Sequence, residues 1–302
     1  MKKIIVTGAT SMIGTALIEN AIKEGTEVYA LVRPNTSRKN RIISSPLVHI
    51  IAGTLEEIHK IEGLPLDCDV FYHFAWTGTE KTQRDDPAIQ EKNICYTLEA
   101  VKLAKKCGCK KFVGAGSQAE YGPTAGIIDS DTRLAPVISY GMAKLAAGNL
   151  SRKMCERLEI THIWGRIFSV YGPHDNDGTM LDYAIGQFSK REEAIFSSAT
   201  QMWNYLYESD AGRMFYLIGE KVEENSIFRI ANNHSQPIKL YIEEVAQIME
   251  TEDLCIFNKS DNQNVVYGIE TCDDKLFEVI DYQPKVSFKE GIKIMIQNRS
   301  EK

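Results

Sequence analysis

The stretch Ile4-Ile5-Val6-Thr7-Gly8-Ala9-Thr10-Ser11-Met12-Ile13-Gly14 decides the fold of this chain. A short apolar run ends in a glycine turn, and apolar residues then recur every four positions at Ile13, Leu17 and Ala21. This pattern predicts a buried strand, a tight turn and a helix that packs one face on a sheet. Gly25 stands where a residue in the left-handed conformation would end that helix.

The glycine turn is also a candidate phosphate site. The first turn of a helix presents unpaired N–H groups and the positive end of the helix dipole. Gly8 would let the main chain approach a pyrophosphate, and Gly14 would let the helix lie close to its strand. Ser11 stands where the middle glycine of such turns often lies, so the fingerprint is incomplete and a plain strand–helix turn is the alternative. The candidate cofactor contacts here are Gly8, Thr10, Ser11, Met12, Ile13 and Gly14.

Length and composition bound the class of protein. The 302 residues can form one large α/β unit or two domains. The net charge of -6, without a basic cluster, argues against a nucleic-acid partner. The apolar runs are too short for a membrane span or an export signal, and the seven scattered cysteines suit a reducing cytoplasm. The isolated Cys107-Gly108-Cys109 and the dispersed histidines predict no metal site, and His73 is expected to be a core or loop histidine rather than a ligand.

A second strand is expected at Glu27–Val32, and Arg33 follows it. Dinucleotide-binding domains usually carry an acid at this point, about 20 residues beyond the turn, to hold the ribose hydroxyls of NAD. Here Arg38, Lys39 and Arg41 come next without an acid among them. A guanidinium can hold a ribose phosphate that a carboxylate would repel. The sequence therefore predicts NADP rather than NAD, with Arg33 and Arg38 as contacts, and a solvated basic loop is the alternative.

Further apolar runs predict a sheet. Strands are expected at Val48–Ile51, Val70–Ala75 and Lys111–Ala115, with a long helix from Pro87 to Cys107 between the last two. Nearly continuous apolar strands separated by helices indicate a parallel sheet covered on both faces, a doubly wound α/β fold. The fifth strand brings Gly116 and Ser117 to the carboxyl edge, where such sheets bind ligands.

The segment Ser139-Tyr140-Gly141-Met142-Ala143-Lys144 carries the candidate chemistry. On a helix, Tyr140 and Lys144 lie one turn apart on the same face. The pKa of a free phenol is near 10, and we expect a nearby ammonium and an oxidised nicotinamide to lower it. Tyr140 would then be a general acid or base, Lys144 would also hold the nicotinamide ribose, and Ser117 would polarise the reacting oxygen. A Tyr-x-x-x-Lys pair alone is weak, so its weight comes from its place after the glycine turn, Arg33 and Ser117.

In that order of motifs, the chain resembles an extended short-chain dehydrogenase/reductase of the nucleotide-sugar epimerase, dehydratase and reductase kind. The resemblance implies a Rossmann domain over residues 1–169 and a smaller substrate-binding region over 170–302, interleaved with the first. It implies Ser117, Tyr140 and Lys144 as the catalytic triad, Phe74 and Ala75 as cofactor contacts, and a homodimer built on helices near 88–107 and 140–158. The matching pieces are Thr7-Gly8…Gly14, Asp69-Val70…His73-Phe74-Ala75, Phe112-Val113…Ser117…Tyr121-Gly122, Tyr140…Lys144, Arg166–Pro173 and Tyr282-Gln283-Pro284.

Departures from the family pattern narrow the chemistry. Related dehydratases carry carboxylates just after the catalytic hydroxyl, where this chain has Gln118 and Ala119, so elimination of water is disfavoured. Ser169 replaces an asparagine that commonly contacts the substrate. Trp203, within Gln201–Tyr205, stands where relatives often carry an arginine for the diphosphate. The candidate substrate contacts are Thr77, Ser117, Gln118, Tyr140, Ser169 and Trp203.

The C-terminal part is expected to hold helices at 179–189, 210–220 and 240–250 and a strand at 227–231. Arg191 and Arg213 are alternative contacts for the diphosphate, although each also fits a solvated helix face. Asp175-Asn176-Asp177-Gly178 lacks the spaced ligands of a calcium loop and predicts a turn.

Three functions are compatible with these residues. The first is an NADPH-dependent reductase of a keto-sugar nucleotide, of the 4-keto-6-deoxy-hexose type, with Tyr140 as the proton donor. The second is a nucleotide-sugar epimerase, which removes a hydride and returns it to the other face of the sugar. The third is a dinucleotide sensor without turnover, which would need none of Ser117, Tyr140 and Lys144. The absence of an acid at Arg33 favours the reductase.

Overall fold

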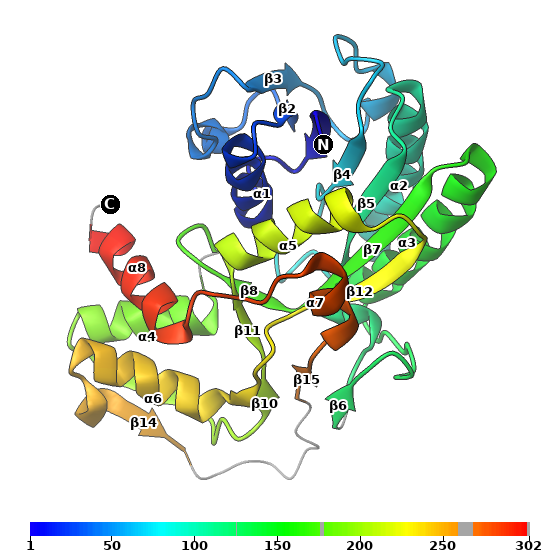
Figure 1. The fold of residues 1–302 in the computed structure, drawn as a ribbon. Coiled ribbons are helices and arrows are strands. Elements are labelled where there is room, and N and C mark those ends of the chain that lie inside the picture. Colours follow the sequence, from blue (N-terminus) through cyan, green and yellow to red (C-terminus); the bar gives the residue numbers. More distant parts are fainter. Residues whose placement is uncertain (125, 176–177, 259–267, 301–302) are drawn as a thin grey trace.

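The structure is a computed structural model, and it describes residues 1–124, 126–175, 178–258 and 268–300. A seven-stranded parallel sheet forms its centre, with strand order β12-β7-β5-β4-β1-β2-β3 (Figure 1). The expected doubly wound α/β fold is confirmed. The strands of this sheet are β1 (Lys3–Thr7), β2 (Glu27–Val32), β3 (Val48–Ala52), β4 (Val70–His73), β5 (Lys111–Ser117), β7 (Thr161–Ile167) and β12 (Ser226–Ile230).

Alternation along β1 builds two cores, one on each face of the sheet. Ile4 and Val6 pack with helices α1 (Met12–Lys23) and α5 (Glu208–Lys221). Ile5, which points to the other face, packs with α2 (Pro87–Lys106) and α3 (Ser139–Leu158). Successive strand residues face opposite sides, so one apolar run serves both layers.

Four predicted strands differ from the structure by one or two residues at their carboxyl ends. β3 ends at Ala52 rather than at Ile51, and β12 ends at Ile230 rather than at Ala231. β4 ends at His73 rather than at Ala75, because the Ala75 N–H turns to the Thr7 side chain at 3.3 Å. β5 continues to Ser117, two residues beyond the predicted strand. His73 is buried, and Thr7 and Thr97 contact its two ring nitrogens, as expected of a core histidine.

A second group of elements lies beside the sheet, at the lower left of Figure 1. Its core holds Phe188, Ile242 and Ile292, one from each of its three helices. The elements are β8 (Ser169–Tyr171), α4 (Met180–Ser189), β9 (Ala194–Phe196), β10 (Met202–Trp203), β11 (Tyr205–Tyr207), β13 (Gln236–Pro237), α6 (Ile238–Met249), β14 (Cys255–Phe257) and α8 (Phe288–Ser300). The turn predicted at 175–178 includes residues 176–177, which lie outside the described residues.

The chain passes back and forth between the sheet and this second group. β12 and α5 lie beyond residue 170 in sequence, yet β12 pairs with β7 and α5 packs on α1. The remaining elements are α7 (Asp274–Ile280), the β6 (Ile127–Ile128) and β15 (Glu270–Thr271) pair, and four short helical turns, η1 (Ser37–Arg41), η2 (Ile58–Lys60), η3 (Gln118–Glu120) and η4 (Glu252–Leu254).

Two buried polar side chains fasten the crossing segments. Asn204 donates to the carbonyls of Asn232, His234 and Thr271 at 3.0 to 3.2 Å, and its own carbonyl accepts from Asn232 N–H at 2.7 Å. Asp210 accepts from the Tyr282 hydroxyl and from Val286 N–H at 2.9 Å. These bonds place the C-terminal segments against the sheet domain.

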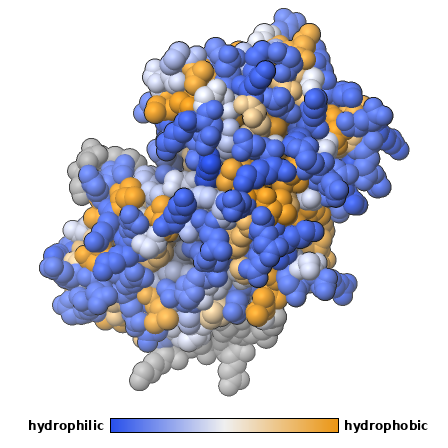
Figure 2. Space-filling view, in the orientation of Figure 1, coloured by the Kyte–Doolittle hydropathy of each residue, from blue (hydrophilic) through white to orange (hydrophobic). Residues whose placement is uncertain are grey.

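Polar residues cover most of the face shown in Figure 2, and apolar ones gather over β12 and α7. Ile227 of β12 and Val279 of α7 are among the exposed apolar side chains. None of the described helices combines the length and the apolarity that a bilayer span requires.

Candidate active site

Ser117 ends β5 and begins a short helical turn. Its hydroxyl accepts from Ala119 N–H at 3.2 Å, and its own N–H donates to Glu120 Oε1 at 2.9 Å. This reciprocal arrangement is a capping box. Glu120 therefore fixes the backbone that carries the Ser117 hydroxyl.

Glu120 is a buried carboxylate beneath the site, and the sequence reasoning did not identify it. Its Oε2 accepts from Arg166 Nε at 2.8 Å, and its Oε1 also accepts from Trp164 Nε1 at 3.0 Å. Arg166 also donates to the Tyr121 hydroxyl at 3.2 Å. The Ser-x-x-Glu spacing, a capping-box signature, is the signal in the sequence that would have indicated its role.

Tyr140 and Lys144 lie on one face of α3, close to Ser117. Lys144 is 3% exposed, its Nζ donates to the Ala115 carbonyl at 2.7 Å, and it lies 5.7 Å from the centre of the Tyr140 ring. Burial raises the pKa of Tyr140, and the hydrogen bond between the Ser117 and Tyr140 side chains lowers that pKa by less. The structure thus brings the three predicted catalytic residues together. Their catalytic roles stay a prediction.

The charges around Tyr140 differ from the expected ones. Burial raises the pKa of Tyr140, the Arg84 guanidinium lowers it, and the Glu120 carboxylate raises it. Burial lowers the pKa of Lys144 to about 7, opposed by Glu120 and assisted by Arg84. Burial therefore outweighs the groups that lower the pKa of Tyr140, and the joint effect of Lys144 and an oxidised nicotinamide stays a prediction. The fixed cation beside the phenol is Arg84, because a guanidinium stays protonated throughout the physiological range.

The segment 74–86, between β4 and α2, supplies this cation. Arg84 Cζ lies 4.5 Å from the centre of the Tyr140 ring, and the Arg84 carbonyl accepts from Tyr140 N–H at 2.8 Å. Asp85 Oδ1 caps the start of α3 by accepting from Ser139 N–H at 2.9 Å. The Trp76 ring lies 3.7 Å from Lys144 Nζ and meets the Tyr140 ring edge-on. The sequence analysis assigned no role to Trp76, Arg84 or Asp85.

The glycine turn fits the phosphates of a dinucleotide. Ser11 caps α1 by accepting from Gly14 N–H at 3.1 Å, which explains why serine stands in place of the middle glycine. A Cβ on Gly14 would lie 2.3 Å from the Gly8 carbonyl oxygen, and a Cβ on Gly8 would lie 2.7 Å from Ala75 N. Gly8 has φ of +70° and packs directly on the predicted contacts Phe74 and Ala75. The N–H of Gly14 is bonded to Ser11. The other N–H groups of the first turn of α1 are oriented to bind an anion, as at any helix start.

Arg33 and Arg38 stand where the sequence reasoning placed them. Arg33 follows the last residue of β2 and is exposed. Arg38 lies in the exposed turn η1, where the Thr36 hydroxyl accepts from its N–H at 3.2 Å. Both guanidinium groups are therefore accessible to a ribose phosphate at the end of β2.

The predicted substrate contacts fall into two groups. Gln118 follows Ser117, and its Oε1 is buried without a hydrogen-bond partner among the described residues. Thr77 is exposed, and its main chain is bonded to the Asn93 side chain at 2.8 and 3.0 Å. Ser169 lies in β8 and Trp203 in β10, both in the C-terminal group, and the Trp203 ring packs on Tyr205.

The alternative anion contacts have other partners. Arg213 pairs with Glu24 at 2.7 Å, and Arg191 donates to the Glu250 carbonyl at 2.7 Å. In the part of the chain that the structure describes, no cluster of three or more His, Cys, Asp or Glu side chains has the arrangement of a metal site. Cys107 and Cys109 are both buried.

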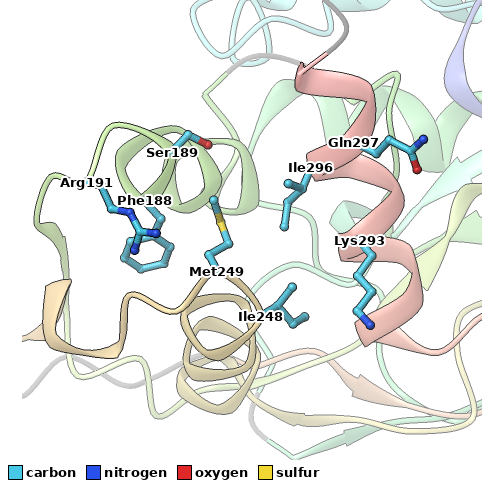
Figure 3. A pocket seen from close by; sticks show the side chains of 8 residues that line it. All are labelled: Phe188, Ser189, Arg191, Ile248, Met249, Lys293, Ile296 and Gln297. Carbon is cyan, nitrogen blue, oxygen red and sulfur yellow. The ribbon is translucent and has the colours of Figure 1, made fainter.

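A hollow of about 460 Å³ lies among α4, α6 and α8 (Figure 3). Phe188, Ile248, Met249 and Ile296 form its apolar lining, and Arg191 and Lys293 stand beside it. None of these residues lies on the elements that carry Ser117, Tyr140 and Lys144. The hollow is therefore separate from the candidate active site.

Comparison with known proteins agrees with this geometry. Residues 4–232 match the family described as "Epimerase: NAD dependent epimerase/dehydratase family". UDP-glucuronic acid decarboxylase 1 of Arabidopsis thaliana is 22% identical over 320 residues, which cover 98% of this chain and 69% of that protein. CDP-abequose synthase of Salmonella muenchen is 26% identical over 213 residues, which cover 69% of this chain and 67% of that protein.

Solved structures share the fold at low sequence identity. The UDP-glucose 4-epimerase of Thermotoga maritima superposes with a TM-score of 0.84 at 18% identity, covering 99% of each chain. The UDP-glucuronic acid 4-epimerase of Bacillus cereus, solved with NAD, superposes with a TM-score of 0.84 at 22% identity, covering 99% of this chain and 97% of that one.

Proposed function

Because the chain belongs to the NAD dependent epimerase/dehydratase family, enzymes of the extended short-chain dehydrogenase/reductase type, we propose that it is an NADPH-dependent reductase of a keto-sugar nucleotide. We propose a 4-keto-6-deoxy-hexose as the type of sugar. The carrying observation is Arg33, exposed directly after β2 where a dinucleotide site that prefers NAD has an acid.

The phosphate-binding part of the proposal rests on three places along one sheet edge. The N-terminus of α1 would hold the pyrophosphate, with Gly8 and Gly14 allowing the close approach. Arg33 and Arg38 would hold a ribose 2′-phosphate. When bound, the cofactor would supply the hydride.

The chain's own residues would manage the proton and the developing charge. The Ser117 hydroxyl would donate a hydrogen bond to the carbonyl oxygen that becomes an alkoxide. Tyr140 would deliver its phenolic proton to that oxygen, and Lys144 would donate hydrogen bonds to the ribose beside it. Gln118, whose buried Oε1 has no partner among the described residues, would accept from a sugar hydroxyl.

An epimerase is the second candidate. The similar solved structures include two epimerases, one of them solved with NAD, and the residues needed for the two reactions overlap almost completely. A sensor without turnover is disfavoured, because Ser117, Tyr140 and Lys144 lie together in a geometry that mere binding does not need.

One assay separates the candidates. The protein is mixed with NADPH and a panel of keto-sugar nucleotides, and in parallel with oxidised cofactor and nucleotide hexoses, and the absorbance of the reduced nicotinamide is followed. Stoichiometric loss supports the reductase, a changed sugar without net loss supports the epimerase, and binding without change supports the sensor. Tyr140→Phe should bind NADPH normally yet lose roughly 10²-fold or more of the turnover, the size typical of a general acid.

The cofactor preference has its own test. Arg33→Asp should shift the ratio of NADPH to NADH affinities toward NADH, because it replaces a phosphate-binding cation by an acid suited to ribose hydroxyls. Lys110→Asp makes the same charge change at the amino edge of the sheet and should leave the ratio unchanged. An unaltered ratio in Arg33→Asp removes the main support for NADP.

The proposed partners are a nucleotide-diphosphate sugar and a second copy of the chain. α2 and α3 pack side by side on one face of the sheet, and Met142 and Leu150 of α3 are among the exposed apolar side chains. Light scattering should therefore report a dimer, and Leu150→Glu should shift it toward the monomer.

A further inference from the structure

Arg84 lies beside Tyr140 and has no role in the reaction proposed above. Its guanidinium carbon lies 4.5 Å from the centre of the Tyr140 ring, within cation–π distance. Its Nε is buried and has no hydrogen-bond partner among the described residues. The charge of Arg84 is therefore directed at the ring, and its Nε is not engaged in an internal bond.

The segment that carries Arg84 is held in place by a buried row of polar side chains on α2. Gln90 accepts from Trp76 Nε1 at 2.9 Å and donates to the carbonyls of Gly78 and Gln83 at 2.7 and 3.1 Å. Asn93 fixes the main chain of Thr77. These bonds bracket the main chain before Arg84, and Asp85 anchors it to α3 at Ser139, so the segment holds Arg84 beside the Tyr140 ring.

The other charged groups lie less directly over the Tyr140 ring. Lys144, from the same helix, has its Nζ 5.7 Å from the ring centre, donates to the Ala115 carbonyl, and has its pKa lowered by burial. Glu120, from the turn after β5, is an acid that raises the pKa of Tyr140 and pairs with Arg166. Ser117 is neutral. A phenolate spreads negative charge into its ring, so a cation over the ring face stabilises it more than it stabilises the phenol.

We propose that Arg84 is a positioning residue for Tyr140, whose preorganised guanidinium stabilises the phenolate that remains when the phenolic proton is given to the substrate. This deepens the proposed function, since Tyr140 is its proton donor. The backbone bond from Tyr140 N–H to the Arg84 carbonyl aligns the helix start, and the side chain sets the charge of the phenol.

The test reads the phenol directly and needs no substrate. A fluorinated tyrosine, which ionises at lower pH than tyrosine, is incorporated at position 140, and its ¹⁹F shift is followed against pH in the full-length protein. Arg84→Met keeps the length and apolar stem of the side chain and removes the charge. In Arg84→Met, the midpoint of ionisation, the pH at which half of the fluorotyrosine is ionised, should rise by about one pH unit. This is the lower end of the effect of an opposite charge about 4–6 Å away. Lys81→Met removes an exposed cation from the same segment and should leave the midpoint unchanged.

Rescue distinguishes charge from structure. Arg84→Lys keeps the charge, so its midpoint should lie close to that of the parent protein. Arg84→Gln removes the charge, so its midpoint should match that of Arg84→Met. Equal midpoints in the parent, Arg84→Met and Arg84→Gln proteins overturn the proposal, as does a midpoint in Arg84→Lys that matches Arg84→Met. If Arg84→Met fails to fold, the Lys and Gln pair decides. A keto-sugar panel without turnover would reject the proposed reductase and leave this result standing on its own.

Discussion

Replacing Glu120 by glutamine should be among the most damaging conservative changes in this protein. Glu120 is 1% exposed and accepts three hydrogen bonds, from Ser117 N, Trp164 Nε1 and Arg166 Nε. In Glu120→Gln the amide oxygen can keep the first two partners, but the amide NH₂ then faces the Arg166 donor. A buried guanidinium is left without its counter-charge, and breaking such a pair by removing one partner costs about 3–5 kcal/mol.

The assay is urea unfolding of the parent and of two variants. Glu223→Gln is the matched control, because Glu223 pairs with Lys111 at 2.7 Å but its side chain is 74% exposed. Exposed pairs contribute about 0–1 kcal/mol, so the control should lose little stability. Glu120→Gln should leave the capping box of Ser117 in place, because the amide oxygen can keep the bond from Ser117 N–H, so the loss should be one of stability.

The reasoning fails if Glu120→Gln costs no more than the control, because the Arg166 charge would then be satisfied by other groups. A double variant, Glu120→Gln with Arg166→Met, tests the electrostatic part separately. It removes both charges, keeps an acceptor for Ser117 N–H and Trp164 Nε1, and should recover a large share of the stability lost in Glu120→Gln, since removing both partners of a buried ion pair costs far less than removing one. If the double variant is no more stable than Glu120→Gln, the stability is lost through packing and not through the unpaired charge.

Three further outcomes follow from buried polar groups. Burial lowers the pKa of Lys144 from 10.5 to about 7, so the unfolded chain binds more protons between these pH values and the buried ammonium costs stability at low pH. Lys144→Met removes that cost and should therefore stabilise the protein more in melts near pH 6 than near pH 10. Asn204→Ala leaves several buried carbonyls and one N–H unpaired and should cost about 3 kcal/mol in urea unfolding, whereas Asn298→Ala, which loses one bond within its own helix, should cost less than about 0.5 kcal/mol. Burial lowers the pKa of His162 to about 4, so between pH 6.5 and 4 the unfolded chain takes up a proton that the folded protein does not, and stability falls with pH. His162→Gln should weaken this fall, whereas the control His59→Gln, at an exposed site, should not.

The sheet could be predicted because its signals are local. β2 has the bounds expected from the apolar run Glu27–Val32, and α2 begins at the predicted Pro87. Parallel strands buried on both faces read as continuous apolar runs, so they need no knowledge of distant partners. The meeting of Ser117 with Tyr140 was also predictable, since parallel strands end at one edge of the sheet.

The polar parts of the site could not be read in the same way. Gln90, Asn93 and Thr97 recur on one face of α2 and look like a solvated stripe, yet all three are buried. Segment 74–86 folds back over Gln90 and Asn93, and Thr97 contacts His73 of β4, so both contacts depend on tertiary structure. Arg84 likewise lies in a run of polar residues that, by composition alone, indicates an exposed loop.

Two cations near one phenol are not redundant, because they differ in what burial does to them. Lys144, at 3% exposure, has its pKa lowered to about 7, so its charge changes in the range where the enzyme would work. It is suited to donating a hydrogen bond, as it does to the Ala115 carbonyl, rather than to supplying a constant field. Arginine keeps its charge when partly buried, so Arg84 can supply that field. If Tyr140 gives up a proton in each turnover, the phenolate that remains needs a cation present at every pH, and in this fold the segment between β4 and α2 provides it.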